Sequence, residues 1–153
     1  MNMGPWSTQD FELMSWHDVH VHGFRFEDYD PDSGSAELLL DIDYILAWEQ
    51  SGATYSFTVC QALLRFQRVS GFRISLDYSA PSAGMCPFSI SGIEREPIER
   101  ANGSVTYRWR LPVSWPTGFV AFEAPSFTQT LVGAPRVQSA QSLAPSDRLI
   151  TPP

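Results

Sequence analysis

Residues Ala36–Trp48 read AELLLDIDYILAW, and this segment has the clearest strand pattern in the chain. Its large apolar positions are spaced two apart: Leu38, Leu40, Ile42, Tyr44 and Leu46. Successive side chains of a β-strand point to opposite faces, so this spacing predicts a strand with one continuous apolar face. Asp41 and Asp43 fall on the other face of the same strand.

Segments with the same two-residue period lie on both sides of this strand. They are Val19–Glu27, Tyr55–Phe66, Phe72–Tyr78, Phe88–Ile98, Val105–Val113, Phe119–Ala124 and Phe127–Val132. Asn102-Gly103 is the strongest hairpin signal, because both central residues of a type I′ turn need positive φ. The apolar positions change phase by one residue after Val59, which predicts a β-bulge near Cys60–Gln61.

About eight strands joined mostly by short turns predict a mainly β fold, either an antiparallel β-sandwich or a barrel-like fold, with little helix. The one helix candidate of any size is Thr8–Trp16. A chain of 153 residues has the length of one domain, so we expect residues 1–153 to form a single domain. Residues 1–16 form its N-terminal segment. Residues 133–153 form an irregular tail rich in Pro, Ser and Gln, with a helical turn near Ser146–Ile150.

The charge pattern bears on the kind of partner. The net charge is −7, and the ten basic residues, all arginine, are scattered among acids. Binding to a phosphate backbone relies on clustered basic residues, so we expect no nucleic-acid partner. An acidic protein instead attracts cationic partners.

The expected compartment is the cytoplasm. Residues 1–10 show no basic region followed by an apolar run, and no apolar run approaches the roughly 20 residues of a membrane helix. Cys60 and Cys86 lack the spacing of a metal or redox motif and are expected to be reduced thiols.

The three histidines lie within six residues and form the only cluster of catalytic residue types. His20 and His22 are two apart on a predicted strand, so both rings point to the same side. Asp41 and Asp43 share one face of the next strand for the same reason. If these faces coincided, the four side chains could surround a divalent ion. The candidate metal ligands are His17, His20, His22 and Asp43.

The expected register argues against that metal site. Pairing Phe24 and Phe26 with the apolar face of the next strand buries large side chains, each worth roughly 1.5–3 kcal/mol. If both strands are regular, this register places His20 and His22 on the inner face of the sheet and the two aspartates on the outer face. We therefore predict no metal and no cofactor.

Other catalytic motifs are missing from the sequence. It contains no GxSxG segment, and a phosphate-binding P-loop needs a lysine that the chain lacks. We therefore predict no catalytic residue. Trp115 lies in a Ser-Trp-Pro turn and is the candidate binding residue, since exposed tryptophan is enriched at binding hot spots. Trp48 and Trp109 lie in or beside alternating runs and are expected in the core.

Several segments resemble a family of small bacterial proteins of unknown function. They are Trp16-His17-Asp18, LDIDYIL at Leu40–Leu46 with Trp48, ALLRFQRV at Ala62–Val69, and Gly92–Glu96. The resemblance spans roughly residues 14–148 and implies a fold but no activity, cofactor or site. In size, acidity and β content the chain is also similar to immunity proteins that neutralise bacterial toxins.

These observations favour a non-catalytic, immunity-like interaction protein that binds a basic protein partner through an acidic face or a sheet edge. A homodimer is compatible with the same features. One alternative is a small metal-binding protein or hydrolase that uses the His17–His22 cluster. Another is a β-barrel that holds a small ligand among its aromatic side chains.

Overall fold

The computed structural model describes residues 1–149, which form ten strands and two short 3₁₀ helices. The strands are β1 (Trp6–Ser7), β2 (Val19–Asp30), β3 (Ser35–Ser51), β4 (Thr54–Asp77), β5 (Phe88–Ile90), β6 (Glu94–Glu99), β7 (Val105–Trp115), β8 (Thr117–Ala124), β9 (Ser126–Leu131) and β10 (Arg136–Gln138). The helices are η1 (Thr8–Leu13) and η2 (Pro145–Asp147). The prediction of a mainly β, barrel-like fold with little helix is confirmed.

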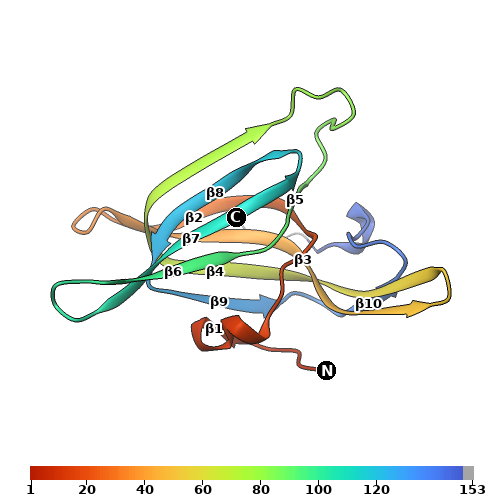
Figure 1. The fold of residues 1–153 in the computed structure, drawn as a ribbon, viewed down its shortest axis with the longest axis horizontal. Helices are drawn as coiled ribbons and strands as arrows, with labels where there is room; N and C mark the ends of the chain where they lie inside the picture. Colours follow the sequence, from red (N-terminus) through yellow and green to blue (C-terminus); the bar gives the residue numbers. More distant parts are fainter. Residues whose placement is uncertain (150–153) are drawn as a thin grey trace.

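The strands are antiparallel and form a partly closed ring around one core (Figure 1). β4 is 24 residues long and pairs with β3, β8, β9 and β10 along different parts of its length. Going round the ring, β2, β3, β4, β8, β7 and β5 each pair with the next, and β5 returns to β2. β9 and β1 extend the sheet beyond β4, and β6 extends it beyond β7.

Aromatic side chains fill the interior of the ring. The ring centroid of Phe66 lies 5.0 Å from that of Trp109 and 4.7 Å from that of Phe122. Trp16 is also buried, and its indole N–H donates to Gln129 Oε1 at 2.8 Å, so its polar atom is satisfied inside the core. Such rings combine a large buried apolar area with favourable edge-to-face geometry.

The N-terminal helix is shorter than predicted, because Thr8–Leu13 is a 3₁₀ helix and not an α-helix extending to Trp16. Its Phe11 packs edge-on against Trp109 at 5.6 Å. From β6, the guanidinium of Arg95 stacks over Phe11 at 4.2 Å and donates to the Thr8 carbonyl. The helix therefore connects β6 to the core through the contacts of Phe11 and Thr8.

The predicted bulge near Cys60–Gln61 is wrong. Cys60 and Gln61 pair in register with Tyr44 and Asp43, and the extra residue is Leu46 of β3. Tyr55, Phe57 and Val59 lie on the outer face of a continuous β4, whereas Ala62, Leu64 and Phe66 lie on its inner face in the core. Both faces carry apolar residues because the C-terminal tail covers part of the outer one.

A second unpredicted bulge lies in β2. Val21 pairs with Ile42 and Gly23 with Asp41, so His22 is the extra residue. Phe24 pairs with Leu40 as expected, but Phe24 and Phe26 are exposed, so the prediction that this register buries them is wrong. The bulge reverses the inward–outward alternation of the β2 residues that precede it, and His20 pairs with Asp43. The expectation that the histidines and aspartates lie on opposite faces is therefore wrong, because it assumed regular strands.

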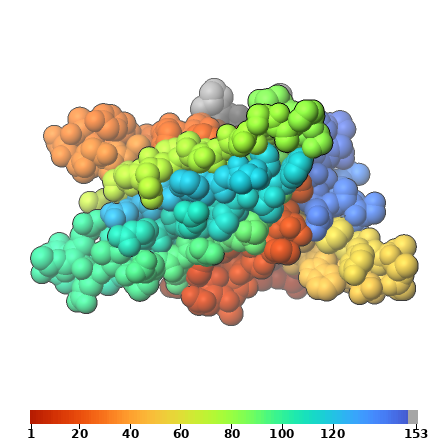
Figure 2. All heavy atoms as spheres, turned by 45° about the horizontal axis from the view of Figure 1, so that its top comes forward, coloured from red at the N-terminus to blue at the C-terminus, as the bar shows by residue number. Residues whose placement is uncertain are grey.

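The tail crosses the outer face of the sheet. β10 pairs with β4, and η2 follows near the end of the described chain. Ile150, the end of the predicted helical turn, and the rest of residues 150–153 lie outside the described residues. In Figure 2 the β2–β3 turn (orange) and the β3–β4 turn (yellow) project at opposite ends of the molecule. Within residues 1–149, no helix is long and apolar enough to cross a membrane.

Candidate binding pocket

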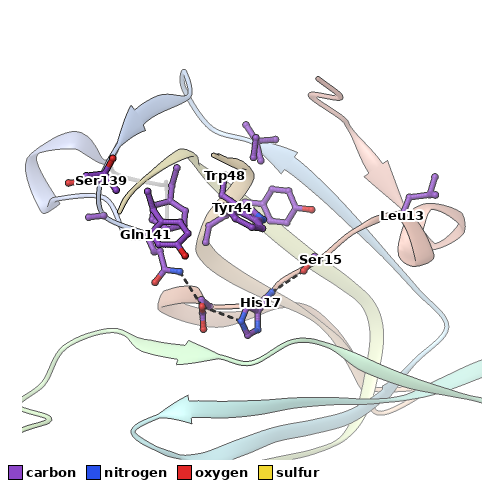
Figure 3. A pocket seen from close by; sticks show the side chains of 15 residues that line it. Leu13, Ser15, His17, Tyr44, Trp48, Ser139 and Gln141 are labelled. Atoms are coloured by element: carbon purple, nitrogen blue, oxygen red, sulfur yellow. Dashed lines mark hydrogen bonds and ion pairs between the residues drawn. The ribbon is translucent and has the colours of Figure 1, made fainter. Parts of the chain in front are cut away.

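A pocket of about 1050 Å³ lies where the β3–β4 hairpin, the segment before β2 and the C-terminal tail meet (Figure 3). The hairpin contributes residues 44–48 and, from β4, Thr54, Tyr55 and Phe57. Facing them are side chains from residues 13–18 and from residues 139–141 of the tail. Pockets for small ligands commonly measure about 300–1,000 Å³, so this one has room for a sizeable ligand.

One wall of the pocket is aromatic. Trp48 is 63% exposed and Tyr55 47% exposed, and their ring centroids lie 6.2 Å apart with the planes tilted by 41°. Tyr55 also stacks on Phe57, with centroids 6.5 Å apart. Trp48 pairs with Phe57 across the hairpin, so the three rings share one face. The extra residue Leu46 reverses the inward–outward alternation of β3, so Trp48 points away from the core. The prediction that Trp48 lies in the core is therefore wrong.

The opposite edge of the pocket is polar. Gln141 Nε2 donates to Asp18 Oδ2 at 3.1 Å, and His17 Nε2 lies 3.3 Å from the same oxygen. The other ring nitrogen of His17 lies 3.2 Å from the Ser91 carbonyl oxygen. Asp18 has φ of 60°, a left-handed conformation that aspartate tolerates better than most residues. Figure 3 shows His17 and Gln141 converging from the N-terminal segment and the tail.

A second polar cluster lies beneath the tail, and we call it the tail cradle: His22, Asp41, Asp43 and Gln61. Arg148 of the tail is 8% exposed and pairs with both aspartates. Asp43 is fully buried, accepts a hydrogen bond from the Leu143 N–H at 2.9 Å, and lies 2.7 Å from His22 Nε2. The side chain amide of Gln61 bonds both the N–H and the carbonyl of Leu149, at 2.7 and 2.9 Å.

The environment of the tail cradle keeps His22 neutral at pH 7. Burial, reinforced by the positive charge of Arg148, lowers the pKa of His22 from its usual 6.5 to about 4. Its Nε2–H therefore donates to the carboxylate of Asp43. The pKa of His20 is also lowered, first by burial and then by His22.

The candidate metal ligands are only partly brought together. His22 and Asp43 are in contact and His17 faces the pocket. His20 Nδ1 is buried and has no hydrogen-bond partner among residues 1–149. The cation beside Asp43 is the guanidinium of Arg148. Among residues 1–149, no three His, Cys, Asp or Glu side chains are placed to hold a metal ion.

The predicted binding residue and the pocket lie apart. Trp115 is exposed at the end of β7, next to the turn into β8, and does not line the pocket. Sequence reasoning missed Tyr55 and Gln141. The phase change after Val59 was the signal for Tyr55, because it marks apolar side chains on the outer face, but no local pattern indicates Gln141.

In comparisons with protein-family models, with curated proteins and with solved structures, none matches the chain. The resemblance to a family of small bacterial proteins therefore stays a prediction. The function has to be argued from the pocket itself.

Proposed function

We propose that this protein is a non-catalytic binding protein whose ligand occupies the pocket between the β3–β4 hairpin and the tail. The observation that carries the proposal is the exposed aromatic pair of Trp48 and Tyr55 opposite the polar edge formed by His17, Asp18 and Gln141. Binding sites combine apolar walls with a few convergent polar groups, which orient the ligand. Exposure of large aromatic side chains to water is unfavourable, and a ligand that covers them would remove this cost.

The contacts of His17 support binding over catalysis. A nucleophile activated by histidine lies within hydrogen-bond reach of the ring, at about 2.6–3.2 Å. Within residues 1–149, the ring nitrogens of His17 face the Ser91 carbonyl and the Asp18 carboxylate, and neither of these groups is a hydroxyl or a thiol. His17 and Asp18 therefore serve to shape and polarise the edge of the pocket.

A thermal-shift screen of chemically varied small molecules tests the proposal. We expect ligands that raise the melting temperature of the wild type but not of Trp48→Ala. Trp115→Ala is the matched control, because Trp115 is an exposed tryptophan outside the pocket. A screen without any ligand that depends on Trp48 contradicts the proposal.

A second candidate function is the binding of a basic protein partner, and an exposed aromatic patch favours it. Phe24 and Phe26 are exposed beside Phe72, with ring centroids 4.9–6.3 Å apart. Apolar patches of this kind mark interaction surfaces. The adjoining end of β2 and the turn after it, residues 27–34, carry four acids, which suits a basic partner.

Phe26→Ser tests this second candidate. We expect it to abolish the capture of a partner, or the formation of a homodimer, that the wild type shows in pull-down and gel filtration. An immunity-like role belongs to this candidate, with a basic toxin as the captured partner. Wild-type protein that captures nothing and remains a monomer contradicts it.

We propose the cytoplasm as the compartment. Cys60 is buried, Cys86 is exposed, and neither forms a disulfide. Unpaired thiols of this kind are typical of a reducing compartment. Thiol labelling of the protein in intact cells and in lysate tests this proposal, and an oxidised Cys86 in cells contradicts it.

A further inference from the structure

We propose that the pocket takes a neutral saccharide, with a pyranose ring stacked on Trp48 and Tyr55 and its hydroxyl groups bonded to the polar edge. This inference rests on the proposed binding function and adds the chemical class of the ligand. It is carried by three properties of the pocket: its charge, its exposed ring faces, and the mixture of donors and acceptors opposite them.

The charge of the lining favours a neutral ligand. Among the described lining residues, Asp18 is the only carboxylate and none is an arginine. An anionic ligand would meet this carboxylate and the net charge of −7 without a compensating cation. A cationic ligand is not required either, because the Asp18 oxygen is already engaged by Gln141 and lies beside His17.

The exposed ring faces suit a ligand with a flat apolar side. Trp48 and Tyr55 present adjacent faces, tilted to one another, on one side of the hairpin. One face of a pyranose ring is a flat array of C–H groups, while its hydroxyls project from the rim. Stacking on the aromatic pair removes the apolar surface of both partners from water.

The polar edge requires a ligand with hydroxyl groups at its rim. The polar lining residues are Ser15, Thr54 and Ser139 in addition to His17, Asp18 and Gln141. The Thr54 hydroxyl donates to the Ser51 carbonyl and the Ser15 hydroxyl accepts from the His17 N–H, so each keeps part of its hydrogen-bonding capacity for a ligand. A hydroxyl group both donates and accepts, so a sugar can match this mixed set. A wholly apolar ligand would displace water from the remaining hydrogen-bonding positions of these groups without replacing those bonds, which is unfavourable.

A glycan array followed by isothermal titration calorimetry tests the inference. The array holds neutral, acidic and amino-bearing oligosaccharides, and we expect the neutral ones to bind. Trp48→Ala should weaken the affinity by about tenfold or more, as for a hot-spot aromatic residue, and Tyr55→Ala should act in the same direction. Trp48 is 63% exposed and Tyr55 47%, and neither belongs to the buried core, so both variants should fold like the wild type.

Trp115→Ala is the control for loss of an exposed tryptophan, and we expect it to change the affinity by less than about twofold. The inference is overturned if no neutral glycan binds, or if binding is unaffected by Trp48→Ala. If cationic amines or fatty acids instead give shifts that depend on Trp48, the saccharide class fails while the proposed binding function stands. If no ligand of any class depends on Trp48, both fail.

Discussion

The molecule contains two pairs of a histidine and an aspartate that differ in their surroundings. His22 and Asp43 lie 2.7 Å apart under the tail, where Asp43 is fully buried. His17 and Asp18 lie 3.3 Å apart at the rim of the pocket, where the His17 side chain is 72% exposed. In the first pair, the tail supplies Arg148 and the Leu143 N–H as partners. The second pair lines the pocket, where Gln141 donates to Asp18 and the Ser91 carbonyl lies beside His17.

The comparison shows that burial, and not residue type, separates a structural pair from a candidate binding pair. The two carboxylates of the tail cradle are paired with groups of the tail itself and therefore hold the tail in place. The polar edge of the pocket keeps capacity for a ligand. Variants of the two pairs should accordingly differ in what they change: stability for the first, ligand binding for the second.

The largest effect is expected from Asp43→Asn. This change removes a buried charge that is paired with Arg148, and breaking such a pair costs about 3–5 kcal/mol. We expect a loss of unfolding free energy near the lower end of that range, because Asp41 still pairs with the guanidinium. Urea denaturation measures it, and Asp18→Asn is the matched control. Equal stability losses in the two variants would erase the contrast between the pairs.

A smaller effect is expected from Gln61→Leu. The change removes the two hydrogen bonds to the backbone of Leu149, each worth about 0.5–1.5 kcal/mol, and the bond from Gln61 to Asp41. We expect limited proteolysis to cut residues 139–149 faster than in the wild type. Mass spectrometry of the fragments locates the cuts. An unchanged cleavage rate would show that the tail is held without the tail cradle.

Stability should also depend on pH through His22. Its pKa is about 4 in the folded protein against 6.5 ordinarily, so the unfolded chain takes up a proton first as the pH falls. Between pH 7 and 5 this should lower the unfolding free energy by about 1–2 kcal/mol. The lowered pKa of His20 acts in the same direction. His22→Gln should flatten the dependence measured by urea denaturation, and an unchanged slope would refute the assignment.

The smallest effect on stability is expected from His17→Ala. The side chain is largely exposed, and surface substitutions usually change the unfolding free energy by no more than about 0.5 kcal/mol. Thermal denaturation measures the change. The same variant should weaken any ligand that requires Trp48. A large loss of stability would instead place His17 among the structural residues.

The strand segments could be predicted because one face of most strands packs on the core and leaves a two-residue period. The segment around Leu40 is the clearest case, since its inner face is fully buried. The bulges at His22 and Leu46 could not be predicted in this way. A bulge depends on what covers each face of a strand, and the period alone cannot show that the tail covers the outer face.

The candidate site was predicted only in part. His17 stood out by residue type as a candidate metal ligand, whereas Trp48 was expected in the core and Asp18 was not among the candidate site residues. The contact between Arg148 and Asp43 joins residues far apart in the sequence, and no local pattern marks it. The pairing of His22 with Asp43 was rejected on the assumption of a regular register, which a single extra residue overturned.

The length of β4 has a consequence for how the chain reaches its fold. Its hairpin with β3 joins Ser51 to Thr54 and needs almost no loop closure, whereas its pairing with β8 joins Asp77 to Thr117. Contacts between distant residues form more slowly because more chain entropy is lost first. We therefore expect the β3–β4 hairpin to form before β4 pairs with β8. Until then the far half of β4 exposes an unpaired edge, where a second unfinished chain can attach and aggregate.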